Sequence, residues 1–160
     1  APESSTFEWL LHAPVEIAVN GQSDIRVIND DAACQAAFLW PRDLTITTTD
    51  QFDPPPRERI QLTEYHLTAQ TPGRQRAQEF VIVLRPHRTT SPLVGAPSLK
   101  RISAGFEVTV PMSGNRVLHA LLNSGDGSAV GTTLSTSGVC CAVVSGADGR
   151  EERRFVVGTE

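Results

Sequence analysis

Short runs of alternating apolar and polar residues recur along most of the chain, and turn-forming residues separate them. Valine and isoleucine occupy every second position in 15–19, Asn20-Gly21 follows, and 25–28 is again rich in β-branched residues. Alternation with a period of two is typical of a strand with one buried face. Asn-Gly between two such runs is a strong hairpin signal, so we expect a tight turn at this dipeptide.

The same pattern predicts about ten short strands and little or no helix. The strands are expected at residues 15–19, 25–28, 34–40, 44–49, 60–69, 80–84, 106–110, 117–122, 138–144 and 155–157. Residues 30–38 are the best candidate for a helix, with Asp30 as its cap, but their apolar positions also alternate and we favour a strand. Many short strands joined by turns predict an all-β fold, an antiparallel β-sandwich.

Proline residues mark the expected ends of three strands. Pro41, Pro86 and Pro111 each follow an apolar run, and proline cannot donate a hydrogen bond to a strand ladder. The run at 80–84 is apolar at every position, which indicates a central strand buried on both faces.

Two segments have the composition of loops. Residues 50–59 contain the consecutive prolines Pro54 to Pro56, and residues 88–97 are rich in threonine, serine, proline and glycine. The second segment could divide a sheet-forming part from a C-terminal part. Because strands are expected on both sides of it, we expect residues 1–160 to form a single β-sandwich domain with a long loop near 88–98.

The overall composition excludes several classes of protein. The chain of 160 residues is 39% hydrophobic and 20% charged, which is ordinary for a globular protein. Its formal net charge of −4 argues against a nucleic-acid binder, which would normally be basic. No apolar run approaches the length of about 18 residues that a membrane-spanning helix needs, so no membrane span is expected.

The three cysteines do not form a disulfide framework, because their number is odd. Cys140 and Cys141 are adjacent and would face opposite sides of a strand. We interpret all three as small buried residues. A bridge from Cys34 to either of the other two stays open at this point.

No complete catalytic or metal site is visible in the sequence. The four histidines, His12, His66, His87 and His119, lie far apart without ligand spacing, so we expect no metal and no cofactor. Tyr65 and His66 are residue types that act as acid and base in lyases of uronate sugars, but neighbours on a strand point to opposite faces. They cannot easily share one substrate, and we expect no catalytic residue in this chain.

Four stretches of the chain are more distinctive: 7–13 (FEWLLHA), 50–56 (DQFDPPP), 63–69 (TEYHLTA) and 80–86 (FVIVLRP). Together with the closing turn at 147–150, they resemble consecutive parts of heparinase II/III-like polysaccharide lyases. Those enzymes have an α/α toroid followed by β-sandwich domains, and they cleave acidic polysaccharides by β-elimination. The resemblance covers the C-terminal β portion alone.

The resemblance implies a function without its own active site. The toroid and an H-x-H-x-D-like segment, which holds a metal in several members, have no counterpart here. We therefore expect an accessory or structural C-terminal β-domain of a polysaccharide lyase that acts on uronate-containing polysaccharide, with the catalytic toroid outside this chain.

The expected partners are an acidic polysaccharide and a separate chain that carries the toroid and its catalytic residues. Aromatic rings stack on sugars and arginine pairs with carboxylates, so the expected substrate contacts come from five side chains. These are Tyr65, His66, Trp40, Arg57 and Arg59. A lyase of this kind also implies a secreted or periplasmic location.

Two other functions remain open from the residues alone. The first is a stand-alone carbohydrate-binding module that uses Trp40 or Tyr65. The second is a protein-interaction or assembly domain, which an exposed apolar patch would favour.

Overall fold

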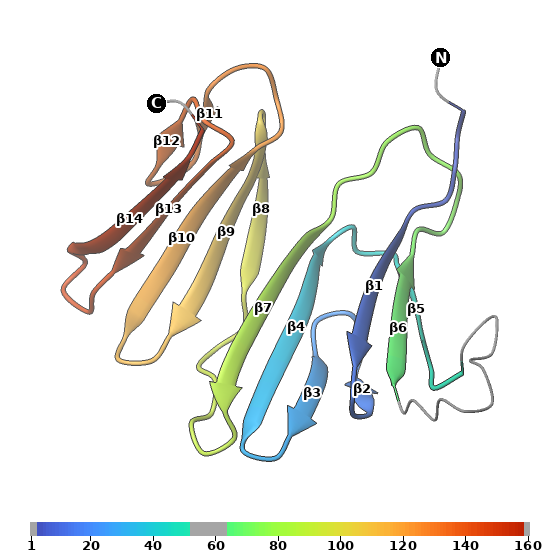
Figure 1. Ribbon diagram of the computed structural model, residues 1–160. Helices are drawn as coiled ribbons and strands as arrows, with labels where there is room; N and C mark the ends of the chain where they lie inside the picture. The colour runs from blue at the N-terminus through green and yellow to red at the C-terminus, as the bar shows by residue number, and fades with distance from the viewer. Residues whose placement is uncertain (1–2, 52–63, 159–160) are drawn as a thin grey trace. The chain divides into compact units, whose positions relative to one another are not determined.

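The computed structural model describes residues 3–51 and 64–158, and it is built from antiparallel strands (Figure 1). Among these residues there are fourteen strands and no helix, which confirms the all-β prediction. No helix in this part of the chain is long and apolar enough to cross a membrane.

The chain divides into two compact units, Ala1–Pro92 and Leu93–Glu160. The division lies inside the loop expected near 88–98. The assignment of residues 1–160 to one domain stays a prediction.

The first unit is a sandwich of two antiparallel sheets. One sheet has the order β1 (Glu8–Ala13), β6 (Tyr65–Gln70) and β5 (Thr45–Thr49). The other has the order β2 (Ile17–Val19), β3 (Ile25–Asn29), β4 (Ala32–Trp40) and β7 (Val81–Arg88). Strands β1 and β6 present apolar residues at alternate positions, so their sheet has one face that must be buried, and residues of β2, β3 and β4 are buried on the facing side of the other sheet.

The two sheets bury these faces against each other in a single core. Leu67 and Ala69 of β6 belong to the same buried cluster as Ile25 of β3 and Phe38 of β4. Trp9 of β1 meets Phe38 edge to face, with ring centroids 5.1 Å apart. An aromatic pair in this geometry adds to the burial of area, so it helps to hold the two sheets together.

The hairpin expected at Asn20-Gly21 is present, but its loop is longer than a tight two-residue turn. Residues 20–24 form a longer loop between β2 and β3, closed by the hydrogen bond from Asn20 N–H to the Asp24 carbonyl (2.9 Å). The two-residue turn joins β3 to β4 instead, since Asn29 pairs with Ala32 and only Asp30 and Asp31 lie between them. Asp30 has a φ of 55°, a conformation that aspartate tolerates in turns. Asp30 is thus a turn residue, and the segment after it is a strand, as favoured.

Two of the three prolines do not end their strands. Pro86 lies within β7, which is the outermost strand of its sheet in the described part of the chain. The expectation of a central strand at 80–84 is therefore wrong, and Leu84 is 51% exposed. Pro111 lies within β9 (Gly105–Met112), beyond the last residue that pairs with the neighbouring strand on one side. Proline is tolerated where its missing N–H has no ladder partner.

The second unit is built on one five-stranded sheet and a short strand pair. The sheet has the order β14 (Glu151–Val157), β13 (Cys140–Ser145), β10 (Arg116–Asn123), β9 and β8 (Ser98–Ile102). The pair consists of β11 (Ala129–Val130) and β12 (Ser135–Thr136). The closing hairpin expected around 146–149 joins β13 to β14, as predicted.

Four strands are additional to the ten that alternation predicted, namely β1, β8, β11 and β12. Strands β11 and β12 have two residues each, too few for a periodic pattern. In β8, Lys100 and Arg101 interrupt the apolar positions. Short or charged strands at a sheet edge are common, because they discourage pairing with other chains.

All three cysteines are free thiols in the structure. The disulfide from Cys34 that the sequence left open is therefore not formed. Cys141 is buried as expected, whereas Cys34 and Cys140 are only partly buried, and this partial burial raises the pKa of both thiols. A raised pKa keeps a thiol protonated and unreactive, in line with packing roles.

Glu107 is a buried carboxylate on β9 with a defined partner. It accepts hydrogen bonds from the Thr132 N–H and the Thr132 hydroxyl, both at 2.8 Å. Burial alone would raise the pKa of Glu107, but the two hydrogen bonds and the charge of Lys100 hold it below its ordinary value of 4.5. The folded state therefore favours the ionised form.

We expect Glu107→Gln to reduce the free energy of unfolding by about 1–3 kcal/mol at neutral pH, because a hydrogen-bonded charge is lost. A depressed pKa stabilises the fold above the unfolded pKa near 4.5, and this contribution disappears as the pH falls through the folded value. The variant should therefore lose less stability than the wild type on acidification below about pH 4.5. Denaturation followed by circular dichroism across this range measures the difference. The exposed Glu152→Gln is the control, and equal acid sensitivity of Glu107→Gln and wild type would contradict the assignment.

Candidate functional site

The outer face of the three-stranded sheet carries a row of polar side chains. On β1 the residues Trp9, Leu11 and Ala13 point to the core, so the residues between them face outward. In the ladder, His12 pairs with His66 of β6, and His66 pairs with Thr49 of β5. Three strands therefore bring polar side chains from distant parts of the sequence into one row across this face.

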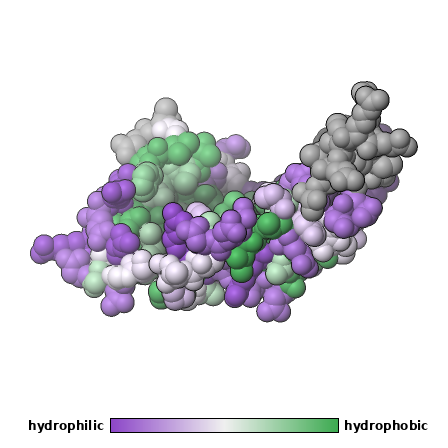
Figure 2. All heavy atoms as spheres, turned by 60° about the horizontal axis from the view of Figure 1, so that its bottom comes forward, coloured by the Kyte–Doolittle hydropathy of each residue, from purple (hydrophilic) through white to green (hydrophobic). Residues whose placement is uncertain are grey.

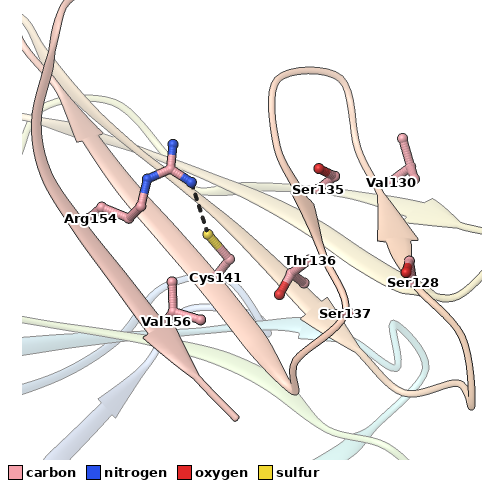
Figure 3. A pocket seen from close by; sticks show the side chains of 8 residues that line it. All are labelled: Ser128, Val130, Ser135, Thr136, Ser137, Cys141, Arg154 and Val156. Atoms are coloured by element: carbon pink, nitrogen blue, oxygen red, sulfur yellow. Dashed lines mark hydrogen bonds between the residues drawn. The ribbon is translucent and has the colours of Figure 1, made fainter. Parts of the chain in front are cut away.

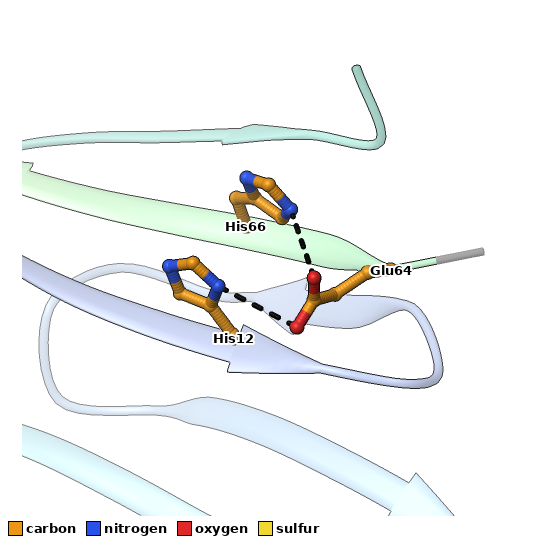
Figure 4. A group of neighbouring side chains, drawn as sticks. All are labelled: His12, Glu64 and His66. Carbon is orange, nitrogen blue, oxygen red and sulfur yellow. Dashed lines mark ion pairs between the residues drawn. The ribbon is translucent and has the colours of Figure 1, made fainter. Parts of the chain in front are cut away.

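His12 and His66 lie side by side across the β1–β6 ladder. Their rings are stacked with centroids 4.5 Å apart and an interplanar angle of 15°. Glu64 precedes His66 by two residues and returns to the same face (Figure 4). One carboxylate oxygen of Glu64 lies 3.5 Å from His12 Nδ1 and the other lies 3.6 Å from His66 Nε2.

This group, which we call the His–Glu–His cluster, is the one set of potential metal ligands found among the described residues. One donor atom from each side chain lies within 4.8 Å of the other two. Imidazole and carboxylate groups can bind divalent metals. The cluster is therefore the strongest concentration of chemically useful groups in the first unit.

Ligand spacing along the chain does not reveal this cluster, because its two histidines are not close in sequence. His12 and His66 belong to strands that are far apart in sequence and become neighbours only through strand pairing. The available signal was that FEWLLHA and TEYHLTA are strand-like and of equal length, with a histidine on the outer face of each.

Tyr65 and His66 face opposite sides of β6. Tyr65 packs against the buried cluster, whereas His66 stacks on His12 at the outer face. This is the arrangement that alternation on a strand predicts. Tyr65 and His66 therefore do not meet at one position, and the tyrosine ring is half-buried against the core.

Trp40 lies on the other sheet, at the end of β4. It pairs with Val81 across an irregularity in the β4–β7 ladder, and a cis peptide bond joins it to Pro41. The structure therefore does not bring Trp40 together with His66 on one sheet. Arg57 and Arg59 lie outside the described residues.

In the second unit a hollow lies between the β11–β12 pair and strands β13 and β14 (Figure 3). Its volume is about 510 Å³. The residues that line it are Ser128, Val130, Ser135, Thr136, Ser137, Cys141, Arg154 and Val156. Arg154 is paired with Glu151 at 2.8 Å, so its charge is already balanced, and its Nη1 lies 3.9 Å from Cys141 Sγ. Hydroxyls and a paired arginine do not make a catalytic set.

Exposed apolar side chains occur at several separate places on the surface. In Figure 2 the hydrophobic residues gather in more than one patch on a face that is otherwise polar. Phe155 and Val157 on β14 and Val139 before β13 are more than half exposed. Nothing in the structure indicates what would cover them.

No family model matches the chain, and the comparison with curated proteins finds no similar sequence.

Proposed function

We propose that this chain is an accessory C-terminal β-domain of a polysaccharide lyase, and that it contributes a wall of the surface that binds an acidic, uronate-containing polysaccharide. The lyase catalyses β-elimination through a toroid domain outside this chain. The observation that carries the proposal is that the two most distinctive stretches of the resemblance form one structural element. FEWLLHA is β1 with the residue before it, TEYHLTA contains most of β6, and the two stretches pair from Trp9 to Ala13.

Pairing of the two stretches supports the proposal by placing them in one element of the fold. Residues from Glu8 to Ala13 pair with residues from Gln70 to Tyr65 without a break. A slip of one residue would exchange the buried and outer faces of the whole strand, so the two sequences must keep their patterns together. A shared pattern at both places is therefore a stronger sign of common architecture than either stretch alone.

The polar outer face of this sheet is the surface that would contact a polysaccharide. Glu8 and Gln70 are hydrogen-bonded at one end of the face, and His66 lies at the other end. Hydroxyl and imidazole groups can exchange hydrogen bonds with sugar hydroxyls, and the arginines expected to contact substrate, Arg57 and Arg59, would pair with carboxylates. An accessory domain of such a lyase would be secreted or periplasmic and would have a partner chain that carries the toroid.

We expect the chain to be retarded in native gels that contain alginate or a heparin-like polysaccharide. The double variant Arg57→Gln/Arg59→Gln should lose most of this retardation, because bidentate contacts to carboxylates are removed. The matched control is Arg150→Gln/Arg153→Gln on the second unit, which changes the net charge equally. Retardation should also weaken as salt is added, since exposed charges are screened.

Two results would contradict this function. Equal mobility of the chain in gels with and without every acidic polysaccharide tested would remove the binding role. Formation of unsaturated uronate products by the chain alone, lost in Tyr65→Phe or His66→Ala, would show that the chain is itself catalytic.

A stand-alone carbohydrate-binding module is less well supported by the side chains. Such modules stack exposed aromatic rings on sugars, but Tyr65 and Trp9 pack against the core. The gels separate the two functions, because a module of this kind would be retarded by neutral polysaccharides and would lose that retardation in Trp40→Ala.

A further inference from the structure

The His–Glu–His cluster has the composition of a transition-metal site. Neutral imidazole nitrogens with one carboxylate oxygen form a mixed nitrogen and oxygen donor set, which suits zinc, whereas magnesium and calcium take oxygen ligands. We propose that His12, Glu64 and His66 bind one divalent transition-metal ion, with zinc as the best match, independently of any polysaccharide.

The distances in the cluster are close to those of a bound ion. Two donor atoms that are each about 2.0–2.2 Å from a tetrahedral zinc lie about 3.3–3.6 Å apart. Each imidazole nitrogen lies at this separation from one of the two Glu64 oxygens, His12 Nδ1 at 3.5 Å from Oε1 and His66 Nε2 at 3.6 Å from Oε2. One donor atom from each residue lies within 4.8 Å of the other two, so the three side chains would have to close by about an ångström to share one ion.

The backbone holds the donors in place before an ion arrives. His12 and His66 are paired residues of neighbouring strands, and the opposite faces of both strands are packed in the core. The side chain of His66 is only 19% exposed, and that of Glu64 is 35% exposed. The two histidine ligands on paired strands need little ordering on binding, and Glu64 directly precedes β6. This favours a specific site over loose association with scattered histidines.

A purely structural role explains the cluster less well. The contacts of Glu64 with the two histidines, at 3.5 and 3.6 Å, are ion pairs only when the rings are protonated, and partly exposed ion pairs contribute little to stability. A cation between the rings and the carboxylate would instead give all three donors the same partner. Three protein ligands leave a fourth position, which a water molecule would occupy, as in zinc sites that are not closed.

Titration of the metal-stripped chain with zinc sulfate, followed by calorimetry, tests the site. We expect saturation at one zinc per chain, with affinity reduced at least about 10-fold in His12→Ala, His66→Ala and Glu64→Gln. His87→Ala and His119→Ala are matched controls, because they remove histidines outside the cluster and should leave the affinity unchanged. Magnesium and calcium chlorides should give no comparable binding.

A measurement on the unaltered chain keeps the test independent of the folding of the variants. In nitrogen-15 spectra of the histidine rings, zinc should shift the ring nitrogens of His12 and His66 and leave those of His87 and His119 in place. Binding that His12→Ala and His66→Ala do not weaken, equal shifts of all four histidines, or no saturable binding of zinc would each overturn the site. Because no polysaccharide is present, these outcomes are independent of the proposed accessory role.

Discussion

Replacing Gly105 by alanine is expected to destabilise the second unit by about 2–6 kcal/mol, from backbone strain of about 1–3 kcal/mol and overpacking of about 1–3 kcal/mol. Gly105 is the first residue of β9 and has a φ of 143°, which side-chain-bearing residues rarely adopt. It pairs with Ile102 of β8 on one side and Asn123 of β10 on the other. A Cβ at this position would lie 2.0 Å from the Leu122 carbonyl oxygen, so the backbone would have to move.

Chemical denaturation followed by circular dichroism measures this effect, because both tryptophans lie in the first unit. Gly127→Ala is the matched control, since no atom lies within 4 Å of the position of its Cβ. We expect the control to change stability by no more than about 0.5 kcal/mol. A loss below about 1 kcal/mol in Gly105→Ala would mean that β8, β9 and β10 do not crowd this residue as described.

Leu67→Ala is expected to destabilise the first unit by about 2–5 kcal/mol, because it removes a large side chain and leaves a cavity. Leu67 is 0% exposed and lies on β6, the middle strand of its sheet. It belongs to the cluster through which the two sheets pack, together with Ile25 and Phe38 of the other sheet. The effect therefore tests whether the sandwich has one shared core.

Tryptophan fluorescence during urea denaturation is the appropriate probe, since Trp9 packs against the same cluster. Leu10→Ala is the control: Leu10 is 54% exposed on β1, and its loss should cost no more than about 0.5 kcal/mol. Leu67→Met, which preserves volume, should cost less than about 1.5 kcal/mol. Similar effects of Leu67→Ala and Leu10→Ala would contradict the burial pattern of the sheet.

The fold class could be predicted because strand alternation is a local property. The runs at 15–19 and 106–110 show it clearly, and each contains or lies within a strand. The place of a strand within its sheet was not predictable in the same way. Pro86 and Pro111 suggested strand ends, but both continue their strands because each lies where one side of the ladder has no partner.

The position of the two-residue turn also could not be predicted from the local dipeptide alone. Asn20-Gly21 has the stronger local preference for a tight turn, yet the two-residue turn is made by Asp30 and Asp31. The pairing of β2, β3 and β4 decides which residues remain between the strands. Burial of Ile25 and Ala36, which are partners in that ladder, fixes the register.

By itself the sequence determined that this chain forms antiparallel strands, and that Tyr65 and His66 face opposite sides of one of them. Both follow from local patterns, namely alternation with a period of two and the turn residues between the alternating runs. Only the tertiary structure decided that His12, Glu64 and His66 meet, because a cluster that draws on two strands depends on which strands pair and in which register. That choice is made by the burial of Leu67, Ala69 and the residues packed around them.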